Sequence, residues 1–458
     1  MFQTVEMPLW GLTLIVLFAA VTFASHFLFP SVRWFFRRRM EKVVARLNER
    51  LERPIQPFKL ARRHDMIQRL IYDPKVAEAI ARHAQKEGIP ENVAFQEARR
   101  YAREIVPAFS ASAYFGFATR LARWISRALY RVRLGHYDEE AIRKIDRDAT
   151  VVFVMNHRSN MDYVLVTYLA AERSALSYAV GEWAQVWPLR GLIRAMGAYF
   201  IRRKSRNTLY RRVLARYVQL ATAGGVAQAV FPEGGLSLDG QVGAPKLGLL
   251  SYILADFKPG KSRDVVFVPV AINYDRVLED RVLLEAAANE VRRFRFDLLR
   301  MLGFAGRQIR FKLAGRYHRF GYAAVSFGDP LSLEAFVGQG AHRTEEVGDE
   351  LMSRIRGVLP VLPVPLVATV LQRADKPLER NEITERVGEL VTSLSGHGAY
   401  VHLPRDSIGY AAEVGLRMLV LRNIVREDQA FFTVNPQETG LIDFYAASIA
   451  HLLDAPAA

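Results

Sequence analysis

The stretch that most constrains this chain runs from residue 151 to residue 162 and reads VVFVMNHRSNMD. Its first five residues are apolar and mostly β-branched or aromatic, which is typical of a strand buried on both faces. From Met161 onwards the apolar residues recur at helical spacing, and Asn160 can cap that helix. The stretch therefore predicts a buried strand, a polar turn and a helix in direct succession.

Two side chains of this turn, His157 and Asp162, have the chemistry of a catalytic pair. Their spacing gives them no common helix face and no common strand face, so only a strand-loop-helix turn brings them together. In contact, the Asp162 carboxylate would fix the imidazole tautomer and leave the other nitrogen of His157 as a general base. A loop histidine next to a capping aspartate, without chemistry, is the simpler interpretation when the pattern stands alone.

The composition restricts the partners and the chemistry of the chain. Its 458 residues are half apolar, which allows a large core and roughly two to three domains. A formal net charge of +16 predicts anionic partners, and nucleic acid, anionic lipid and phosphorylated substrates all qualify. Because the chain has no cysteine, disulfides, thiolate nucleophiles and cysteine-based zinc sites are excluded.

The N-terminal residues 1–40 predict a membrane anchor with a basic flank. Residues 8–30 contain no Asp, Glu, Lys or Arg over a length that can cross a bilayer core, so we expect a transmembrane helix. A cleaved signal peptide is the alternative, although no Lys or Arg precedes the apolar stretch. The expected membrane contacts are Trp10, Trp34, Arg37, Arg38 and Arg39. The positive-inside rule then predicts a single-pass protein whose catalytic part is cytoplasmic, and we expect a bacterial inner membrane.

Two regions before residue 138 are predicted to be helical. Residues 41–110 are rich in Arg, Glu and Ala and are interrupted by prolines, which indicates several short helices without visible chemistry. Residues 112–134 place arginines on one side of a helix and apolar residues, including Trp124, on the other. Such a helix can lie on an anionic membrane surface, or it can pack against the domain with a solvated arginine face.

Residues 138–330 alternate between short apolar strands and amphipathic helices, which predicts an α/β domain over residues 111–330. The candidate strands are residues 150–155, 197–201, 226–231, 265–272, 308–314 and 323–327. The candidate helices are residues 160–171, 207–222 and 246–257. Residues 331–458 lose the alternation and predict a mainly helical C-terminal domain that can include a winged hairpin.

Polar clusters follow four of the candidate strands at the point where each strand ends. They contain His157 after the first strand, Arg202 and Arg203 after the second, Glu233 with Gly234 and Gly235 after the third, and Asn273 after the fourth. Ligands bind beyond the carboxyl ends of strands in open α/β sheets, so one pocket would collect all four clusters. It would hold a base, guanidinium groups suited to phosphate, and a glycine loop whose spare N–H groups can face an oxyanion. Each cluster alone can also be a solvated charge run or an ordinary turn.

These clusters, in this order, resemble the conserved blocks of the glycerolipid acyltransferases, and most closely the membrane-bound glycerol-3-phosphate acyltransferase family. The resemblance is carried by NHRSNMD, GAYFIRR, FPEGG with the following PKLG, and VPVAINYD, and it extends to RLARWISRALY and FYAASIAHLL. It implies an α/β fold with a mixed sheet flanked by helices. It also implies transfer of a fatty acyl group from acyl-CoA or acyl-carrier protein to the sn-1 hydroxyl of glycerol 3-phosphate, without a metal or another cofactor.

The resemblance assigns an expected role to each block. His157 would be the base and Asp162 would orient it. The expected glycerol 3-phosphate site consists of Arg202, Arg203, Glu233, Gly234, Gly235, Ser237 and Lys246, and the acyl donor would border Pro269 and Asn273. One departure concerns Leu236, which stands where the family usually has Arg between the glycine pair and Ser237. The acceptor could therefore also be 1-acylglycerol 3-phosphate or dihydroxyacetone phosphate.

Two interpretations from other classes compete with an enzyme. A membrane-tethered nucleic-acid-binding protein would explain the positive charge. However, much of the excess lies near the predicted anchor and the four clusters, and the C-terminal region shows no basic recognition helix, so we expect no nucleic-acid partner. A non-catalytic acyl-CoA or phospholipid binder would keep the cationic clamp without a working base. The sequence predicts no particular oligomeric state.

Overall fold

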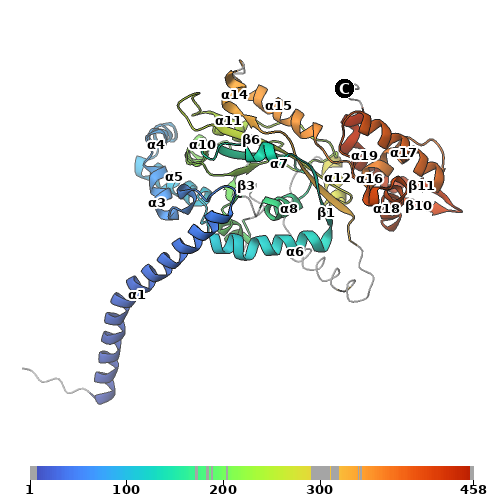
Figure 1. The fold of residues 1–458 in the computed structure, drawn as a ribbon. Coiled ribbons are helices and arrows are strands. Elements are labelled where there is room, and N and C mark those ends of the chain that lie inside the picture. The colour runs from blue at the N-terminus through green and yellow to red at the C-terminus, as the bar shows by residue number, and fades with distance from the viewer. Residues whose placement is uncertain are drawn as a thin grey trace, which may run out of the picture. The chain divides into compact units, whose positions relative to one another are not determined.

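The computed structural model describes most of the chain and divides it into two compact units, Met1–Ile55 and Gln56–Ala458 (Figure 1). The described residues are 8–170, 174–181, 185–186, 189–202, 205–289, 310, 319–338, 340 and 343–453, without the side chains of residues 21, 23–37, 40 and 170. The boundaries predicted at residues 110 and 330 fall inside the second unit, and the subdivision that they define stays a prediction.

The first unit consists mainly of one long helix, α1, over Leu9–Arg50. In the part of the chain that the structure describes, no helix is both long and apolar enough to cross a membrane, so the predicted transmembrane helix is not confirmed. Trp10, Arg38 and Arg39, three of the predicted membrane contacts, are exposed. The side chains of the other two, Trp34 and Arg37, lie outside the described residues.

Four helices open the second unit: α2 over Pro57–Leu60, α3 over Arg63–Ile71, α4 over Pro74–Glu87 and α5 over Glu91–Ile105. Pro57 and Pro74 occupy first helical positions, where a missing N–H costs no intrahelical bond. Gly88 ends α4 in the left-handed conformation, with φ of 64°. The short helices predicted for residues 41–110 are therefore present from residue 57 onwards.

A mixed sheet forms the centre of the second unit, with the strand order β1-β7-β6-β2-β5-β3-β4 and with β8 paired to β6. The strands are β1 Arg131–Tyr137, β2 Thr150–Met155, β3 Ser177–Gly181, β4 Tyr199–Ile201, β5 Gln228–Val230, β6 Val265–Tyr274, β7 Tyr322–Phe327 and β8 Leu331–Ser332. The central strand β2 runs parallel to both β5 and β6, whereas β7 is antiparallel to β6. The sheet is therefore mixed, as the resemblance implied.

Successive side chains of β2 enter two different cores, as the alternation of a strand requires. Val151 and Phe153 pack in the core that also contains side chains of α8 (Met161–Ala170) and of the C-terminal region. Val152 and Val154 pack in the core shared with α10 (Thr208–Ala223) and with α3 to α5. Because both faces are covered, β2 is buried at every position, which explains its uninterrupted apolar sequence.

The other elements of the second unit lie around this sheet. They are the π-helix η1 (Ser112–Ala118), α6 (Thr119–Leu129), α7 (Glu139–Arg143), α9 (Leu189–Ala195), α11 (Gly248–Leu254), α12 (Asp280–Ala288), α14 (Leu333–Gly338) and α15 (Thr344–Gly357). The C-terminal region adds α16 (Pro363–Gln372), α17 (Arg380–Gly396), α18 (Ile408–Leu421) and α19 (Thr439–Leu453). A small antiparallel sheet joins β9 (Leu378–Glu379), β10 (Val425–Asp428) and β11 (Phe431–Val434).

Several predicted elements agree with the structure within a few residues, one predicted helix was too long, and one strand was missed. The helix predicted over residues 112–134 ends at Leu129, because Tyr130 is extended and residues 131–137 form the edge strand β1. The strand β3 was not predicted at all. Most of the predicted strand 308–314 lies outside the described residues.

Candidate active site

The turn between β2 and α8 places His157 and Asp162 in direct contact. The imidazole Nδ1 lies 2.9 Å from Asp162 Oδ2, and both side chains are almost fully buried. The turn itself is fixed to the next strand, because the side-chain amide of Asn156 exchanges two hydrogen bonds with the backbone of Ile272. The strand-loop-helix geometry that the sequence required for this pair is present.

The Asp162 carboxylate accepts hydrogen bonds from four directions. Besides His157, the backbone N–H groups of Arg158 and Ser159 donate to Oδ2 over 2.8 and 3.0 Å. The hydroxyl of Tyr274 donates to Oδ1 over 2.6 Å. These donors fix the position of the carboxylate, which in turn holds one ring nitrogen of His157.

Two aromatic rings surround the imidazole of His157. Phe231 stacks on it with a centroid distance of 4.1 Å, and Tyr163 meets it edge-on at 5.4 Å. Within the described residues, Nε2 of His157 makes no hydrogen bond that would occupy it. A ring with Nδ1 held by a carboxylate and Nε2 unoccupied can accept a proton from a hydroxyl group.

Glu233 supports the histidine turn, although the sequence predicted a place in the acceptor site. Its Oε1 accepts the backbone N–H of His157 over 3.0 Å, and its Oε2 accepts that of Gly243 over 3.3 Å. Burial raises the pKa of Glu233 to about 7, although these two hydrogen bonds and nearby Arg158 act in the opposite direction. The side chain is only 8% exposed, which leaves it little access to a ligand.

The loop that begins at Glu233 is organised by its own contacts. Gly234 has φ of +66°, and its N–H donates to the carbonyl of Phe231, so that N–H is not a spare oxyanion donor. Ser237 is buried: its N–H donates to the His157 carbonyl over 2.9 Å, and its hydroxyl donates within the loop to Asp239 and Gln241. Ser237 therefore holds the loop, and its predicted contact with the acceptor stays a prediction.

The same loop contains Gly235, Leu236 and Lys246. Lys246 is exposed and lies next to Gly234, where an added Cβ would be 2.9 Å from Lys246 Cδ. It precedes the first residue of α11 by two positions. Gly235 is half-buried, and Leu236 packs against the hydrophobic core. Lys246 is thus the one cation of this loop that the structure leaves exposed to solvent among its described residues.

The predicted guanidinium clamp is only partly described. Arg202 follows β4 and makes a two-pronged ion pair with Glu104 of α5, over 2.9 and 2.6 Å. Arg203 lies outside the described residues. The parallel pairing of β2, β5, β3 and β4 puts Arg202 at the same sheet edge as His157, but three strand spacings, or about 14 Å, away. Arg202 is thus held by Glu104 at this edge of the sheet, and its predicted contact with the acceptor phosphate stays a prediction.

The two residues predicted to border the acyl donor are buried in the fold. Pro269 lies inside β6, in register with Val154, and its carbonyl accepts the N–H of Gly328. Asn273 donates from its side-chain amide to the carbonyl of Pro360 over 3.0 Å and is fully buried. Both side chains are held inside the fold, and their predicted contacts with the acyl donor stay a prediction.

Sequence reasoning missed two residues that hold the catalytic turn. Tyr274 was part of a recognised block but received no role, and Glu279 was not singled out at all. The Glu279 carboxylate accepts the Ser159 hydroxyl over 2.7 Å and the side-chain amide of Asn160 over 3.0 Å. The predicted helix cap at Asn160 was therefore wrong, and the Ser159 hydroxyl accepts the first helical N–H instead.

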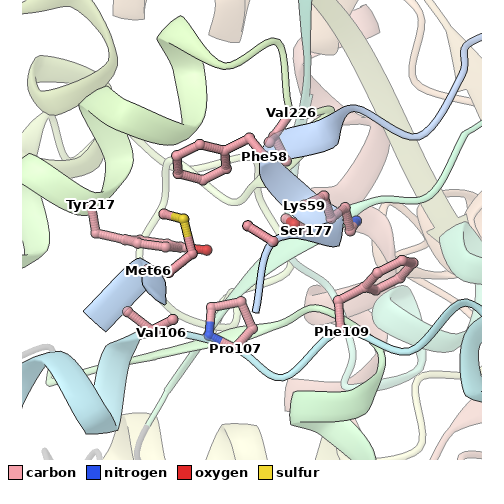
Figure 2. A pocket seen from close by; sticks show the side chains of 10 residues that line it. Phe58, Lys59, Met66, Val106, Pro107, Phe109, Ser177, Tyr217 and Val226 are labelled. Atoms are coloured by element: carbon pink, nitrogen blue, oxygen red, sulfur yellow. The ribbon is translucent and has the colours of Figure 1, made fainter. Parts of the chain in front are cut away.

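A pocket at the opposite end of the strands is a different site (Figure 2). It is lined by Phe58, Lys59, Ala61, Met66, Val106, Pro107, Phe109, Ser177, Tyr217 and Val226. Ser177 begins β3, whereas His157 follows the end of β2, so this pocket lies at the amino ends of the parallel strands. Its free volume of about 20 Å³ is little more than one water molecule requires, which excludes an acyl chain in this conformation. The described residues also contain no cluster of three or more His, Asp or Glu side chains arranged for a metal ion.

Two family models match separate parts of the chain. Residues 135–273 match the family model described as Acyltransferase, and residues 311–458 match the model described as Glycerol-3-phosphate acyltransferase C-terminal region. The resemblance seen in the sequence blocks is confirmed by these matches.

The relatives carry the same name. Glycerol-3-phosphate acyltransferase of Ectopseudomonas mendocina (strain ymp) is 30% identical over 359 residues, which are 73% of this chain and 42% of the relative. That of Shewanella amazonensis is 28% identical over 446 residues, 90% of this chain and 53% of the relative. This chain thus spans about half the length of the curated relatives it matches. A crystal structure of the 1-acyl-sn-glycerophosphate acyltransferase PlsC from Thermotoga maritima matches 57% of this chain and 80% of that chain, with 18% identity and a TM-score of 0.34.

Proposed function

We propose that this chain transfers a fatty acyl group from an acyl-CoA or acyl-carrier-protein thioester to the sn-1 hydroxyl of glycerol 3-phosphate. The product is 1-acylglycerol 3-phosphate, and no metal or other cofactor takes part. The observation that carries the proposal is the His157 imidazole, which Asp162 holds at Nδ1 over 2.9 Å. The names of the relatives support the substrate pair.

The proposed reaction is a direct transfer. Nε2 of His157 takes the proton of the acceptor hydroxyl while that oxygen attacks the thioester carbonyl. The tetrahedral intermediate collapses with cleavage of the carbon–sulfur bond, and the imidazolium returns the proton to the departing thiolate. Asp162 keeps Nδ1 protonated and stabilises the imidazolium that forms. The candidates for binding the acceptor phosphate are Lys246, beside the Glu233 loop, and the predicted clamp residues Arg202 and Arg203.

Leu236 supports an alternative acceptor for the same chemistry. Its side chain packs against the core at the position where the family usually has an arginine, so one expected phosphate ligand is missing. One alternative acceptor is 1-acylglycerol 3-phosphate, whose acyl chain adds apolar contacts, so its binding would depend less on a phosphate ligand at position 236. Dihydroxyacetone phosphate is the other candidate. The alternative to an enzyme is a non-catalytic protein that binds acyl-CoA or lipid.

A comparison of acceptors tests these proposals. Detergent-purified full chain receives palmitoyl-CoA with glycerol 3-phosphate, dihydroxyacetone phosphate or 1-acylglycerol 3-phosphate, one at a time. We expect the highest kcat/KM with glycerol 3-phosphate. Preference for another acceptor would change the proposed substrate and leave the proposed mechanism unchanged. Palmitoyl-CoA binding without turnover of any acceptor, with carrier-protein donors included, would contradict the enzyme and favour the binder.

We also propose that α1 attaches the chain to a membrane, most simply the bacterial inner membrane, with the catalytic unit on the cytoplasmic side. Several large apolar residues near its start are exposed: Leu9, Trp10, Leu12, Leu14, Ile15, Val16, Leu17 and Phe18. Such a surface is unfavourable in water. Membranes of an expressing bacterium, washed with alkaline carbonate, should retain the chain, and release into the wash would contradict a stable anchor.

A further inference from the structure

The helical segment before β1 presents an arginine-rich face. Residues 105–137 contain five arginines and no Asp, Glu or Lys. Arg120, Arg123 and Arg127 of α6 are exposed, and Arg131 follows at the start of β1. A cluster of exposed guanidinium groups attracts an anionic partner.

The opposite side of α6 is packed against the catalytic unit. Ala122 and Ser126 are buried, and Ile125 and Leu129 pack against the core that contains α8. Tyr168 of α8 also receives a hydrogen bond from Arg127 Nε over 3.2 Å. The orientation of α6 is therefore fixed, and its outer face carries the exposed Arg120, Arg123 and Arg127.

Two large aromatic side chains share that outer face. Trp124 is 65% exposed and Phe117 of η1 is 54% exposed. The sequence had placed Trp124 on the apolar side, which would have left a plain arginine face toward solvent. The structure contradicts that placement, and an ordinary solvated arginine face does not explain two exposed aromatic rings next to the arginines.

We propose that the outer face of η1 and α6 binds the surface of an anionic phospholipid bilayer. Trp124 and Phe117 would lie at the level of the headgroups, where amphipathic aromatic rings are favoured. Arg120 and Arg127 would contact lipid phosphates, because juxtamembrane arginines are attracted by anionic lipids. An acidic protein could bind the arginines. A bilayer would in addition bury the rings of Trp124 and Phe117, and it suits a helix such as α6 that lies along the surface of its domain.

The surface consists of residues other than those of α1 and of the proposed acyl-transfer site. It nevertheless has a consequence for the site, because α6 packs directly on α8, whose first turn carries Asp162. Binding through this face would therefore place α6 between the lipid headgroups and the helix that carries Asp162.

Brominated lipids test the proposal at Trp124 itself. The full chain is mixed with phosphatidylglycerol vesicles that contain brominated phosphatidylcholine, and tryptophan quenching is recorded for wild type and Trp124→Phe. The difference between the two proteins reports Trp124 among the five tryptophans of the chain. We expect that difference signal to be quenched by phosphatidylglycerol vesicles and not by neutral vesicles.

Charge reversal gives the matched control. Because α1 can hold the full chain on a vesicle by itself, the readout is the Trp124 quenching. Arg120→Glu combined with Arg127→Glu should reduce the quenching of Trp124 by phosphatidylglycerol vesicles by at least about tenfold, given the contribution of each arginine near an anionic surface. Arg373→Glu with Arg417→Glu makes the same charge change at exposed positions elsewhere and should change that quenching less than twofold. Acyl transfer in detergent should be equal in all these proteins, so a failure here is distinct from a failure of the proposed enzyme.

Two outcomes would overturn the proposal. The first is vesicle binding without quenching of the Trp124 signal, because another surface would then carry the lipid contact. The second is retention of an acidic carrier protein by the arginine face, lost in the Arg120→Glu/Arg127→Glu protein, while Trp124 remains unquenched by lipid.

Discussion

The imidazole of His157 is surrounded by neighbours that come from distant parts of the sequence. Asp162 is close in the chain, and its spacing from His157 made the contact predictable. Tyr274, which fixes the other oxygen of Asp162, is 112 positions away from it. Glu279 is 120 positions from Ser159. Local spacing cannot specify such contacts, because they depend on the order of β2 and β6 in the sheet.

Asp162→Asn tests the orientation of the histidine. The amide would offer a donor where Nδ1 needs an acceptor, so we expect kcat to fall by about a thousandfold or more with the fold retained. Steady-state kinetics and circular dichroism measure the two effects. Asp349→Asn, at an exposed position, is the control. An activity loss of the same size in both proteins would contradict a specific role for Asp162.

Glu233 predicts a pH dependence of stability. Its folded pKa of about 7 lies above the ordinary value of 4.5, so the folded state binds more protons than the unfolded state between these values. The free energy of unfolding should therefore fall as pH rises from 4.5 through 7, by up to about 1.4 kcal/mol per pH unit. Buried Asp275, with a pKa also raised to about 7, adds a fall of the same sign.

Urea unfolding at pH 5, 6, 7 and 8 measures that slope. Glu233→Gln removes the titrating group, so its free energy of unfolding should change less with pH than that of wild type. Glu285→Gln, at an exposed position of α12, should keep the wild-type pH dependence. An equal slope in wild type and Glu233→Gln would show that Glu233 is ionised throughout this range.

At the scale of elements, the sequence was most informative where periodicity was strong. The uninterrupted apolar run of β2 and the helical spacing in α10 both predicted elements with nearly correct bounds. β1 was read as the end of a helix, because its alternating arginines continue the amphipathic pattern of α6. Residues 131–137 form a strand because they pair with β7, which lies almost 200 residues further along the chain. β3 has only five residues, too few for a clear period.

The loop between β6 and α12 should act on the catalytic turn through Glu279. Glu279→Ala removes the acceptors of Ser159 and Asn160 and leaves the turn less fixed, so we expect kcat to fall by about a hundredfold with little change in KM. Initial rates at varied substrate give the two constants separately. Glu285→Ala, an exposed position on α12, is the control. A rise in KM at constant kcat would instead indicate a substrate contact.

At the scale of the whole molecule, the C-terminal region packs against the catalytic loops. The guanidinium of the buried Arg158 lies 5.0 Å from the ring of Phe444, and it donates to the carbonyl of Gly240. Asp280 accepts Arg422 over 2.6 Å and the Tyr445 hydroxyl over 2.5 Å. The site therefore depends on contacts between residues 135–273 and residues 311–458, which two different family models match. A truncation between these segments would expose the surfaces that form the contacts.

Gly240 provides a test of that packing. It has φ of +89°, and a Cβ added there would be 1.9 Å from the carbonyl oxygen of Phe444. Gly260 has a similar φ of +67° with nothing within 4 Å of an added Cβ. We expect Gly260→Ala to cost about 1 kcal/mol from backbone strain and Gly240→Ala about 3 kcal/mol or more. Thermal unfolding compares them, and equal losses would contradict the close contact with α19.

The most direct measurement is a single-turnover assay of acyl transfer with radiolabelled palmitoyl-CoA, glycerol 3-phosphate and excess protein, for wild type and His157→Ala. We predict labelled 1-acylglycerol 3-phosphate with wild type, and a rate reduced at least about a hundredfold in the variant with its unfolding transition retained. An equal rate in a folded His157→Ala protein would contradict the assignment of the base, and with it the account of this site.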